Sequence, residues 1–479
     1  MTALRFGPIW TDHMVVQRDR PAPIWGYGPP GADLELSFAG RAAAGRVGPD
    51  GRWTIRVNPG PACAEPGSLL VSLAGGGAAI RLRDVLVGDV WLCAGQSNME
   101  LGLADALDGA QAVATADHPA IRLFPIEKTS APAPVRRVGA AWRRCAPDTV
   151  AAGGWGGFSA VAYWFARRVN AATGIPIGLI QAAFGGSKIH PFIHPAFLDG
   201  DPALDELRSE LADADRVWLE TLALEGLEAS DDPSAAELAM HPFAGYSEWD
   251  QLKPATVWNA MIHPLLPAAL RGVLWYQGES DVADPAPYPA KMDALARGFR
   301  HAFADDDLPL YFAQVAPYRY GPDADLLEFW EAQYAAADAP GCGMVATVDL
   351  GDLNDIHPLD KRPVGERLAG LALARAYGLA DIPSGGPRLG SVAFGPFGAV
   401  VGYEAFGELA TLDGGAPLGF ELAGADGVFH PAAAAIDGGA VVLRCAAVAE
   451  PRHIRHCWRV GRCPNLSDGS AIPALPFRR

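Results

Sequence analysis

The sequence lacks a long apolar run. It contains no window of about 18 uninterrupted apolar residues, which is the length that a transmembrane helix needs. Its first residues, Met1–Gly7, also lack a basic segment followed by an apolar stretch, which argues against an attached signal peptide. The sequence as it stands therefore predicts a cytoplasmic protein, or a periplasmic or secreted one if a signal peptide has been removed.

Cysteine is scarce and scattered. The seven cysteines include no C-x-x-C pair, and an odd number cannot pair fully within one chain. This pattern argues against a zinc site and against a disulfide framework, although Cys457 and Cys463 are close enough in sequence to pair in an oxidising compartment. We therefore expect neither a metal nor another cofactor.

Positive charge is also in short supply. The chain has 38 Lys and Arg against 55 Asp and Glu, which gives a formal net charge of −17. An acidic protein repels nucleic acid and anionic membranes, so we expect neither as a partner. The negative net charge slightly favours a neutral substrate over a polyanionic one. The sequence does not indicate an oligomeric state.

A chain of 479 residues is too long for one compact core, and its composition changes twice. Half-buried strand patterns at 33–38 and 53–57 indicate a β region at the start. A Gly-rich, β-patterned region returns at the end. We predict three parts: an N-terminal β domain at 1–85, an α/β domain at 86–380 with a helical insertion at about 196–250, and a C-terminal β domain at 385–479.

The middle part alternates apolar runs with helix-period stretches. Such alternation predicts βαβ units and a mostly parallel sheet buried on both faces. The expected strands are at 90–94, 121–126, 177–183, 272–276, 309–315 and 343–349, and the expected helices are at 158–172, 288–303 and 363–377.

Four of these strands are followed by polar, glycine-bearing segments. Ligands of an open parallel sheet bind outside the carboxyl ends of its strands. The four segments together carry what acyl transfer needs, namely a nucleophile, a base, an orienting acid and oxyanion donors. In chain order they are Gly95-Gln96-Ser97-Asn98, Phe184-Gly185-Gly186-Ser187, Gln277-Gly278-Glu279-Ser280-Asp281, and 350–358 with Asp355 and His357.

Each segment also has an ordinary structural interpretation. Taken alone, Ser97 would be a helix N-cap, Gly185-Gly186 a turn, Gln277 a polar strand end, and the pair of Asp355 and His357 a surface ion pair. Their coincidence at successive strand ends favours an enzyme. The G-x-S-x-G elbow of α/β-hydrolases occurs nowhere in the chain, which argues against a lipase or protease of that fold.

The blocks Gly95–Met99, Trp275–Ser280 and Asp355–Pro358 together resemble the signature blocks of the sialate O-acetylesterase family. This family is a branch of the SGNH hydrolases that includes carbohydrate acetylesterases. Thr11–Arg18 and Phe158–Tyr163 extend the resemblance along nearly the whole chain. It implies an SGNH-type three-layer αβα domain with a mostly parallel sheet, plus accessory β-sandwich or jelly-roll units from the N- and C-terminal segments.

The resemblance implies a role for each matching residue. Ser97 would attack the acetyl carbonyl, His357 would take and later return its proton, and Asp355 would orient His357. SGNH enzymes commonly place the acid three residues before the histidine, where this chain has Asn354. Asp352, or a Ser–His dyad oriented by a carbonyl group, therefore remains an alternative.

The resemblance also implies oxyanion donors and a substrate pocket. The donors would be the backbone N–H of Ser97, that of Gly186 (or Gly185), and the side-chain amide of Gln277. The segment after Gly186 departs from the family pattern and is expected to line the sugar pocket. The residues assigned to substrate binding are Gln96, Asn98, Glu279, Lys188 and His190.

The sequence thus predicts a metal-independent serine esterase that releases acetate from acetylated carbohydrate through an acetyl-enzyme on Ser97. Two substrate classes stay open: O-acetylated sialic acid, and acetylated xylo-oligosaccharides or other hemicellulose fragments. The alternative is a catalytically silent carbohydrate-binding protein on the same scaffold.

Overall fold

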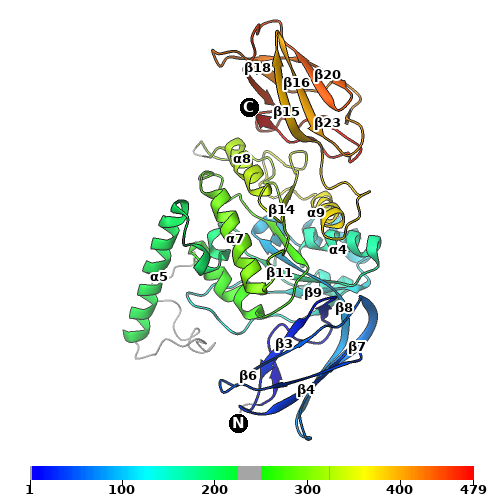
Figure 1. The fold of residues 1–479 in the computed structure, drawn as a ribbon, viewed down its shortest axis with the longest axis vertical. Helices are drawn as coiled ribbons and strands as arrows, with labels where there is room; N and C mark the ends of the chain where they lie inside the picture. Colours follow the sequence, from blue (N-terminus) through cyan, green and yellow to red (C-terminus); the bar gives the residue numbers. More distant parts are fainter. Residues whose placement is uncertain (1–2, 225–249, 323) are drawn as a thin grey trace. The chain divides into compact units, whose positions relative to one another are not determined.

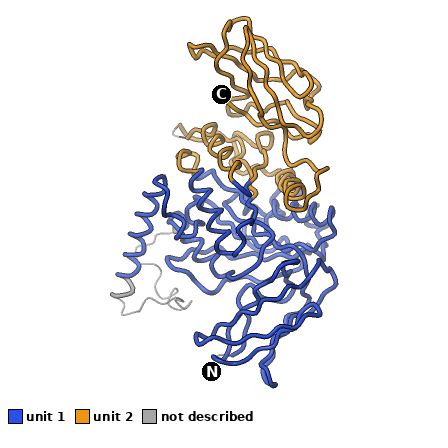
Figure 2. The backbone as a smooth tube through the Cα atoms, in the orientation of Figure 1, with its two compact units in different colours: residues 1–280, 289–310, 340–342 blue, residues 281–288, 311–339, 343–479 orange. Residues whose placement is uncertain are grey.

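The computed structural model describes residues 3–224, 250–322 and 324–479. It divides into two compact units (Figures 1 and 2). The first unit comprises residues 1–280, 289–310 and 340–342, and the second comprises 281–288, 311–339 and 343–479. The fold is mixed α/β, with a large sheet that combines parallel and antiparallel strand pairs.

The long strand β8 (Ala79–Gly95) organises the first unit. Its first half alternates between exposed and buried residues and pairs antiparallel with β7 (Cys63–Leu73). Its second half is buried throughout and runs parallel between β11 (Ile177–Ala183) and β12 (Gly272–Tyr276). The expectation of a mostly parallel sheet therefore describes the surroundings of this second half, whereas the sheet as a whole is mixed.

The other strands before β8 are short. β1, β3 and β6 form an antiparallel three-stranded sheet, while β4 pairs with β5 and β7, and β2 runs parallel to β8. Their bounds are β1 Arg5–Phe6, β2 Val15–Gln17, β3 Ala22–Tyr27, β4 Asp33–Phe38, β5 Arg41–Arg46 and β6 Arg52–Val57.

A half-buried carboxylate, Asp84, links the β7–β8 region to the strands that follow. Asp84 meets Arg122 through two hydrogen bonds of 2.6 and 3.1 Å, and its Oδ2 also lies 2.6 Å from Arg144 Nε and from His13 Nδ1. The Asp84 side chain is 10% exposed. Burial alone would raise the pKa of Asp84, but the hydrogen bonds from Arg122, Arg144 and His13 lower it well below its ordinary value.

This cluster makes a stability prediction. The pKa of Asp84 is lower in the folded than in the unfolded protein. The stability that the Asp84 carboxylate contributes is therefore complete above its unfolded-state pKa of about 4, and it is lost as the pH falls toward the folded-state pKa. We expect Asp84→Asn to cost about 3 kcal/mol at pH 7, since it leaves the buried Arg122 without its counter-charge. The difference from the wild type should shrink below about pH 4.

Thermal unfolding of both proteins is measured at pH 7 and again at a pH below about 4, the unfolded-state pKa of an aspartate. Asp33→Asn is the matched control, because the pair of Asp33 and Arg46 is exposed and is worth about 1 kcal/mol or less. Equal losses for Asp84→Asn and Asp33→Asn at pH 7 would contradict the structural role of Asp84.

The remaining elements of the first unit lie around the parallel strands. Helix α4 begins after Ser159, whose hydroxyl accepts the Ala162 N–H, and ends at Gly174 in the left-handed region. The elements are α1 Ser97–Glu100, α2 Gly109–Ala114, β9 His118–Pro125, β10 Arg143–Cys145, α3 Pro147–Val150, α4 Ala160–Thr173, α5 Asp205–Leu224 and α7 Tyr288–Phe303.

The predicted domain limits stay a prediction. The limit between 85 and 86 falls inside the single strand β8. The predicted helical insertion at 196–250 contains α5, but residues 225–249 of it lie outside the described part of the chain.

The second unit begins with a short α/β part. It contains β13 Leu310–Ala313, α8 Leu326–Ala337, β14 Cys342–Val345 and α9 Arg362–Arg375. The sequence predicts β14 to continue to 349, and this is wrong. Thr347 donates its N–H to the side chain of Gln314 at 3.1 Å and its hydroxyl to the Gln314 carbonyl at 2.8 Å, so its backbone has left the strand ladder.

The rest of the second unit consists of short antiparallel strands. One sheet has the order β15-β16-β21-β20, another has the order β19-β18-β22-β24, and β17 pairs with β23. The strands are β15 Arg388–Gly395, β16 Gly398–Glu404, β17 Ala410–Thr411, β18 Phe420–Ala423, β19 Phe429–Pro431, β20 Ala433–Asp437, β21 Ala440–Arg444, β22 His453–His456, β23 Leu466–Ser467 and β24 Phe477–Arg478.

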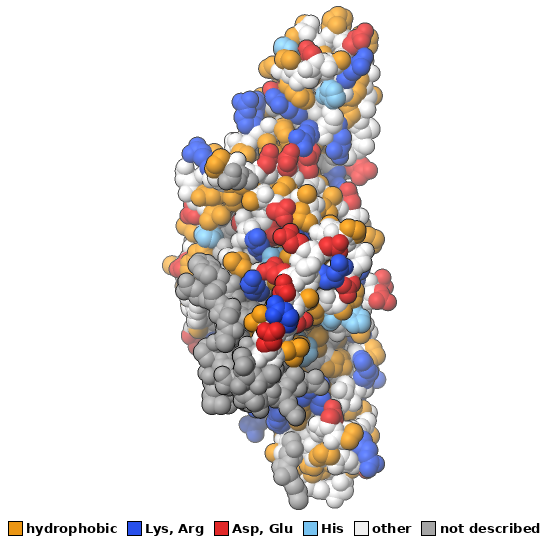
Figure 3. Space-filling view, turned by 90° about the vertical axis from the view of Figure 1, so that its left-hand side faces the viewer, with side chains coloured by type: hydrophobic (Ala, Val, Ile, Leu, Met, Phe, Trp, Pro, Cys, Tyr) orange, Lys and Arg blue, Asp and Glu red, His pale blue; other side chains and the backbone are white. Residues whose placement is uncertain are grey.

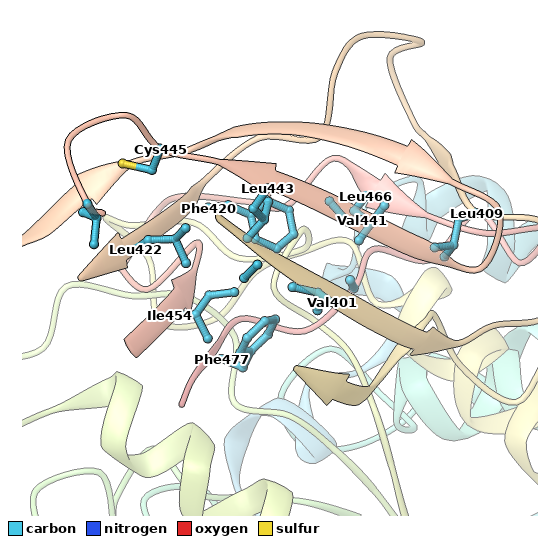
Figure 4. Packing of buried hydrophobic residues seen from close by; sticks show 13 residues of the cluster. Val401, Leu409, Phe420, Leu422, Val441, Leu443, Cys445, Ile454, Leu466 and Phe477 are labelled. Atoms are coloured by element: carbon cyan, nitrogen blue, oxygen red, sulfur yellow. The ribbon is translucent and has the colours of Figure 1, made fainter. Parts of the chain in front are cut away.

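These strands share one apolar core (Figure 4). Val401 and Leu443 come from the first of the two four-stranded sheets, and Leu422 comes from the second. His456 is fully buried beside this core, with its ring stacked on Phe420 at 4.1 Å between centroids. Burial lowers the pKa of His456 to about 4, so this histidine is neutral at physiological pH.

The surface carries mixed charge. Acidic and basic side chains are interspersed with apolar ones on the face shown in Figure 3. In the described ranges, no helix is both long and apolar enough to cross a membrane.

Candidate active site

Three parallel strands end at the same level. In the register of the sheet, Gly95 at the end of β8 is opposite Ala183 of β11 on one side and Tyr276 of β12 on the other. The next residue of each chain segment therefore leaves the sheet at one edge. The structure brings together the polar segments that begin at Gln96, Phe184 and Gln277, as expected for the carboxyl edge of a parallel sheet.

Gly95 allows the sharp turn that presents Ser97. Its φ is +141°, and a Cβ at this position would lie 2.1 Å from the carbonyl oxygen of Tyr276, so no other residue fits without a shift. Gln96 is the N-cap of the short helix α1, and Ser97 is its first residue. The interpretation of Ser97 as an N-cap is therefore wrong, and its side chain is not needed for capping. Ser97 is 8% exposed.

The Gln96 side chain joins two of the three segments. Its Oε1 accepts the backbone N–H groups of Gly278 at 3.3 Å and Ser280 at 3.4 Å, while the backbone N–H of Gln96 donates to the Tyr276 carbonyl at 3.0 Å. Gln96 is buried. These bonds fix the Ser97 turn against the segment that carries Gln277.

Asn98 and Glu279 form a second buried link. Asn98 Nδ2 donates to Glu279 Oε1 at 2.5 Å, and both side chains are buried. Burial and the charge of Glu279 raise the pKa of Tyr276 well above its ordinary value, so this phenol stays neutral. The link holds the first residues of α1 against the segment after β12.

Glu100 makes the corresponding link to the segment after β11. Its Oε2 accepts the Gly185 N–H at 2.8 Å, and its Oε1 accepts a hydrogen bond from Lys128 Nζ at 2.7 Å. Sequence reasoning assigned no role to Glu100 or to Lys128. Glu100 lies three residues after Ser97, which places it one helical turn from the serine, whereas no sequence signal marks Lys128.

The predicted oxyanion donors lie in these segments. Gly186 has φ +76°, is exposed, and accepts a 3.1 Å hydrogen bond from Ser280 Oγ at its carbonyl oxygen. Gln277 is fully buried, and its Nε2 donates to the Ser187 carbonyl at 3.3 Å. A Cβ placed on Gly185 would lie 3.6 Å from Ser97 Cβ, which shows how closely the glycine turn approaches the serine.

The two predicted substrate-binding residues after Gly186 differ in their surroundings. Lys188 is half-buried. His190 is buried in a short 3-10 helix, and its Nε2 lies 2.7 Å from the Leu252 carbonyl oxygen. His190 therefore has a structural contact of its own, and its assignment to substrate binding stays a prediction, as does that of Lys188.

The histidine segment lies in the second unit. Asp352 Oδ1 accepts the Asn354 N–H at 2.8 Å, and Asp355 Oδ1 accepts the His357 N–H at 2.8 Å, so two successive side-chain turns shape it. Asp355 Oδ1 lies 4.0 Å from His357 Nδ1, which is longer than a hydrogen bond. The His357 side chain is 29% exposed.

Arg367 anchors the start of this segment. It forms a two-pronged ion pair with Asp349, at 2.7 and 2.6 Å, and donates to the Ala346 carbonyl at 2.8 Å. The structure thus places Asp355 and His357 together in a braced loop, and it groups Ser97, Gly186 and Gln277 in the first unit.

A metal centre is not indicated. No group of three or more His, Cys, Asp or Glu side chains in residues 3–224, 250–322 and 324–479 could hold a metal ion. The expected absence of a metal and of another cofactor stays a prediction.

Comparisons with known proteins give the family. The family model described as carbohydrate esterase, sialic acid-specific acetylesterase, matches residues 87–207 and 244–377. Sialate O-acetylesterase of Rattus norvegicus is 28% identical over 423 residues, covering 80% of this chain and 75% of the relative. The Homo sapiens enzyme of the same name is 26% identical over 433 residues, covering 80% and 73%.

A solved structure agrees along the whole chain. The crystal structure of a carbohydrate acetylesterase from Xanthomonas citri has a TM-score of 0.83 and 34% sequence identity, and the match covers 99% of both chains. The fold and these matches together define a carboxylic ester hydrolase. Because the family model matches more than half of the chain, the protein belongs to the sialic acid-specific acetylesterase family of carbohydrate esterases. The predicted family is confirmed.

Proposed function

We propose that this esterase removes acetyl groups from a carbohydrate through an acetyl-enzyme on Ser97. One observation carries the proposal: the shared register of β8, β11 and β12 gathers Ser97, the Gly185-Gly186 turn and Gln277 at one sheet edge. Cys93 is not a competing nucleophile, because it is fully buried and burial raises the pKa of its thiol far above physiological pH.

In the proposed mechanism, Ser97 Oγ attacks the acetyl carbonyl carbon while His357 takes the hydroxyl proton. The tetrahedral intermediate then breaks its bond to the sugar oxygen, which leaves with the proton from His357. Water, deprotonated by His357, attacks the acetyl-enzyme and releases acetate, and Ser97 regains its proton. The family model spans the segments of both residues.

The proposed oxyanion donors are the N–H groups of Ser97 and Gly186 and the amide of Gln277. The hydrogen bonds of the turn favour Gly186 over Gly185, because the Gly185 N–H already donates to Glu100 at 2.8 Å. A preorganised donor of this kind contributes roughly 100- to 1,000-fold in rate. In this proposal, Glu100 and the pair of Asn98 and Glu279 also hold the donors in place. The assignment of Gln96, Asn98 and Glu279 to substrate binding stays a prediction.

Asp355 is the proposed orienting acid. It lies two residues before His357 with its Oδ1 4.0 Å from His357 Nδ1, and catalytic hydrogen bonds are often longer in a substrate-free site than in the reacting complex. Asp352 and Asp355 each accept one backbone N–H of the loop at 2.8 Å, so Asp355 is preferred for its 4.0 Å approach to His357 Nδ1, and Asp352 is the weaker candidate. A dyad of Ser97 and His357 oriented by a carbonyl group is the remaining alternative.

Acetate release decides between the substrate classes. The relatives' names support O-acetylated sialic acid, and the Xanthomonas citri structure supports acetylated carbohydrate in general. We expect the protein to release acetate from O-acetylated sialic acid, from acetylated xylo-oligosaccharides, or from both, and to hydrolyse p-nitrophenyl acetate. Sugar binding without acetate release from any of them would instead indicate the silent carbohydrate-binding protein.

A further inference from the structure

We infer that Arg319 binds the carboxylate of an acidic acetylated sugar beside the histidine loop. This inference rests on the proposed function, because it takes His357 as the catalytic base. It names the substrate class that the proposed site prefers.

Arg319 is attached to the histidine segment at two points. It lies after β13, in the connection that leads to α8. Its backbone N–H donates to the Leu353 carbonyl at 3.3 Å, and its Nη1 donates to Asn354 Oδ1 at 3.0 Å. The guanidinium group is therefore fixed next to the residue that stands three positions before His357.

The charge of Arg319 is not neutralised by the protein. Among the described residues, no carboxylate lies within ion-pair distance of its guanidinium group, and the residue is exposed. The neighbouring Asp352 and Asp355 instead accept backbone N–H groups of their own loop. Some arginines of the second unit have acidic partners, namely Arg362, Arg367, Arg388, Arg455 and Arg478. Others, such as Arg452, form no ion pair among the described residues.

Asn354 distinguishes Arg319 from an exposed arginine such as Arg452, because it holds the guanidinium group in place. Its amide oxygen orients the guanidinium group without cancelling the charge, whereas a carboxylate at this position would form an ion pair with it. An arginine always carries its charge and presents N–H groups in a planar fork that matches a carboxylate. With Nη1 held by Asn354, the rest of the fork remains for a ligand carboxylate.

The flanking side chains suit a sugar. Tyr318 and Tyr320 are half-buried on either side of Arg319 in sequence, and their rings meet edge to face at 5.1 Å between centroids. Aromatic rings offer apolar faces to the C–H groups of a sugar ring. The ligand class is therefore a sugar acid, and both sialic acid and a uronic acid carry the required carboxylate.

The test compares acidic and neutral substrates. We expect Arg319→Met to lower the ratio of kcat/KM for an acidic acetylated sugar to that for acetylated xylo-oligosaccharide by about tenfold, through KM. O-acetylated sialic acid and acetylated glucuronic-acid-substituted xylo-oligosaccharide are measured separately, which distinguishes the two sources of the carboxylate. Arg452→Met, an exposed arginine of the β part of the second unit, is the control for net charge.

A binding measurement separates failure of the inference from failure of the proposed function. Titration calorimetry with sialic acid, glucuronic acid and their methyl esters needs no turnover. Carboxylate-dependent binding that Arg319→Met weakens about tenfold and Arg452→Met does not would support the inference even if no acetate were released. Equal effects of the two variants, or equal binding of an acid and its methyl ester, would overturn it. Asn354→Asp should weaken acid binding as Arg319→Met does, because the new carboxylate would form an ion pair with the guanidinium group.

Discussion

Replacing Ser97 by alanine should lower kcat for p-nitrophenyl acetate and for acetylated sugar by about four to six orders of magnitude. The variant lacks the oxygen that forms the acetyl-enzyme, so only transition-state binding by the oxyanion donors remains. The fold should persist, because Ser97 is not the N-cap of α1 and the cap residue Gln96 keeps its bonds to Gly278 and Ser280. Rates are measured together with thermal unfolding.

Ser37→Ala is the matched control for this variant. Ser37 is an exposed serine of β4 in the same unit, so its loss should leave the rate within about twofold of the wild type. Undiminished turnover by Ser97→Ala would remove Ser97 from the mechanism. A large loss of rate accompanied by unfolding would instead assign Ser97 a structural role.

Replacing His357 by alanine should lower kcat by about four orders of magnitude or more, because no base then takes the Ser97 proton. The double variant of Ser97→Ala and His357→Ala should be no slower than Ser97→Ala alone, since the two groups act as one unit. This comparison tests their coupling by kinetics, independently of any distance.

His453→Ala is the control for this second variant. His453 is an exposed histidine of β22 in the same unit, so its replacement should leave kcat unchanged. Additive losses in the double variant would show that His357 acts separately from Ser97. A mild loss in His357→Ala would point to another base.

Local patterns predicted most of the α/β elements. β11 and β12, as well as α7, have the bounds expected from their apolar runs and helical period. These signals are local, because strand and helix formation depend on neighbours in sequence. The predicted extension of β14 to residue 349 is wrong because the Thr347 N–H donates to the side chain of Gln314, which lies over thirty residues away in sequence.

The predicted boundary at 85 stays a prediction. It depends on the change from half-buried strand patterns to apolar runs that alternate with helical stretches. At this position the chain continues as one strand, β8. The burial pattern of β8 changes because β7 covers one part of the strand, whereas β11 and β12 flank the other.

For the candidate site, the sequence and the tertiary structure also determined different features. The sequence itself determined the candidate chemical groups, since a serine after a strand-ending glycine, a glycine pair, a glutamine and an acid–histidine pair are visible in short segments. Tertiary structure decided that three strands end in register at Gly95 and that Glu100 holds Gly185. It also decided that the guanidinium group of Arg319 contacts the amide of Asn354. These features depend on strand register and on hydrogen bonds between residues far apart in sequence, which no local pattern encodes.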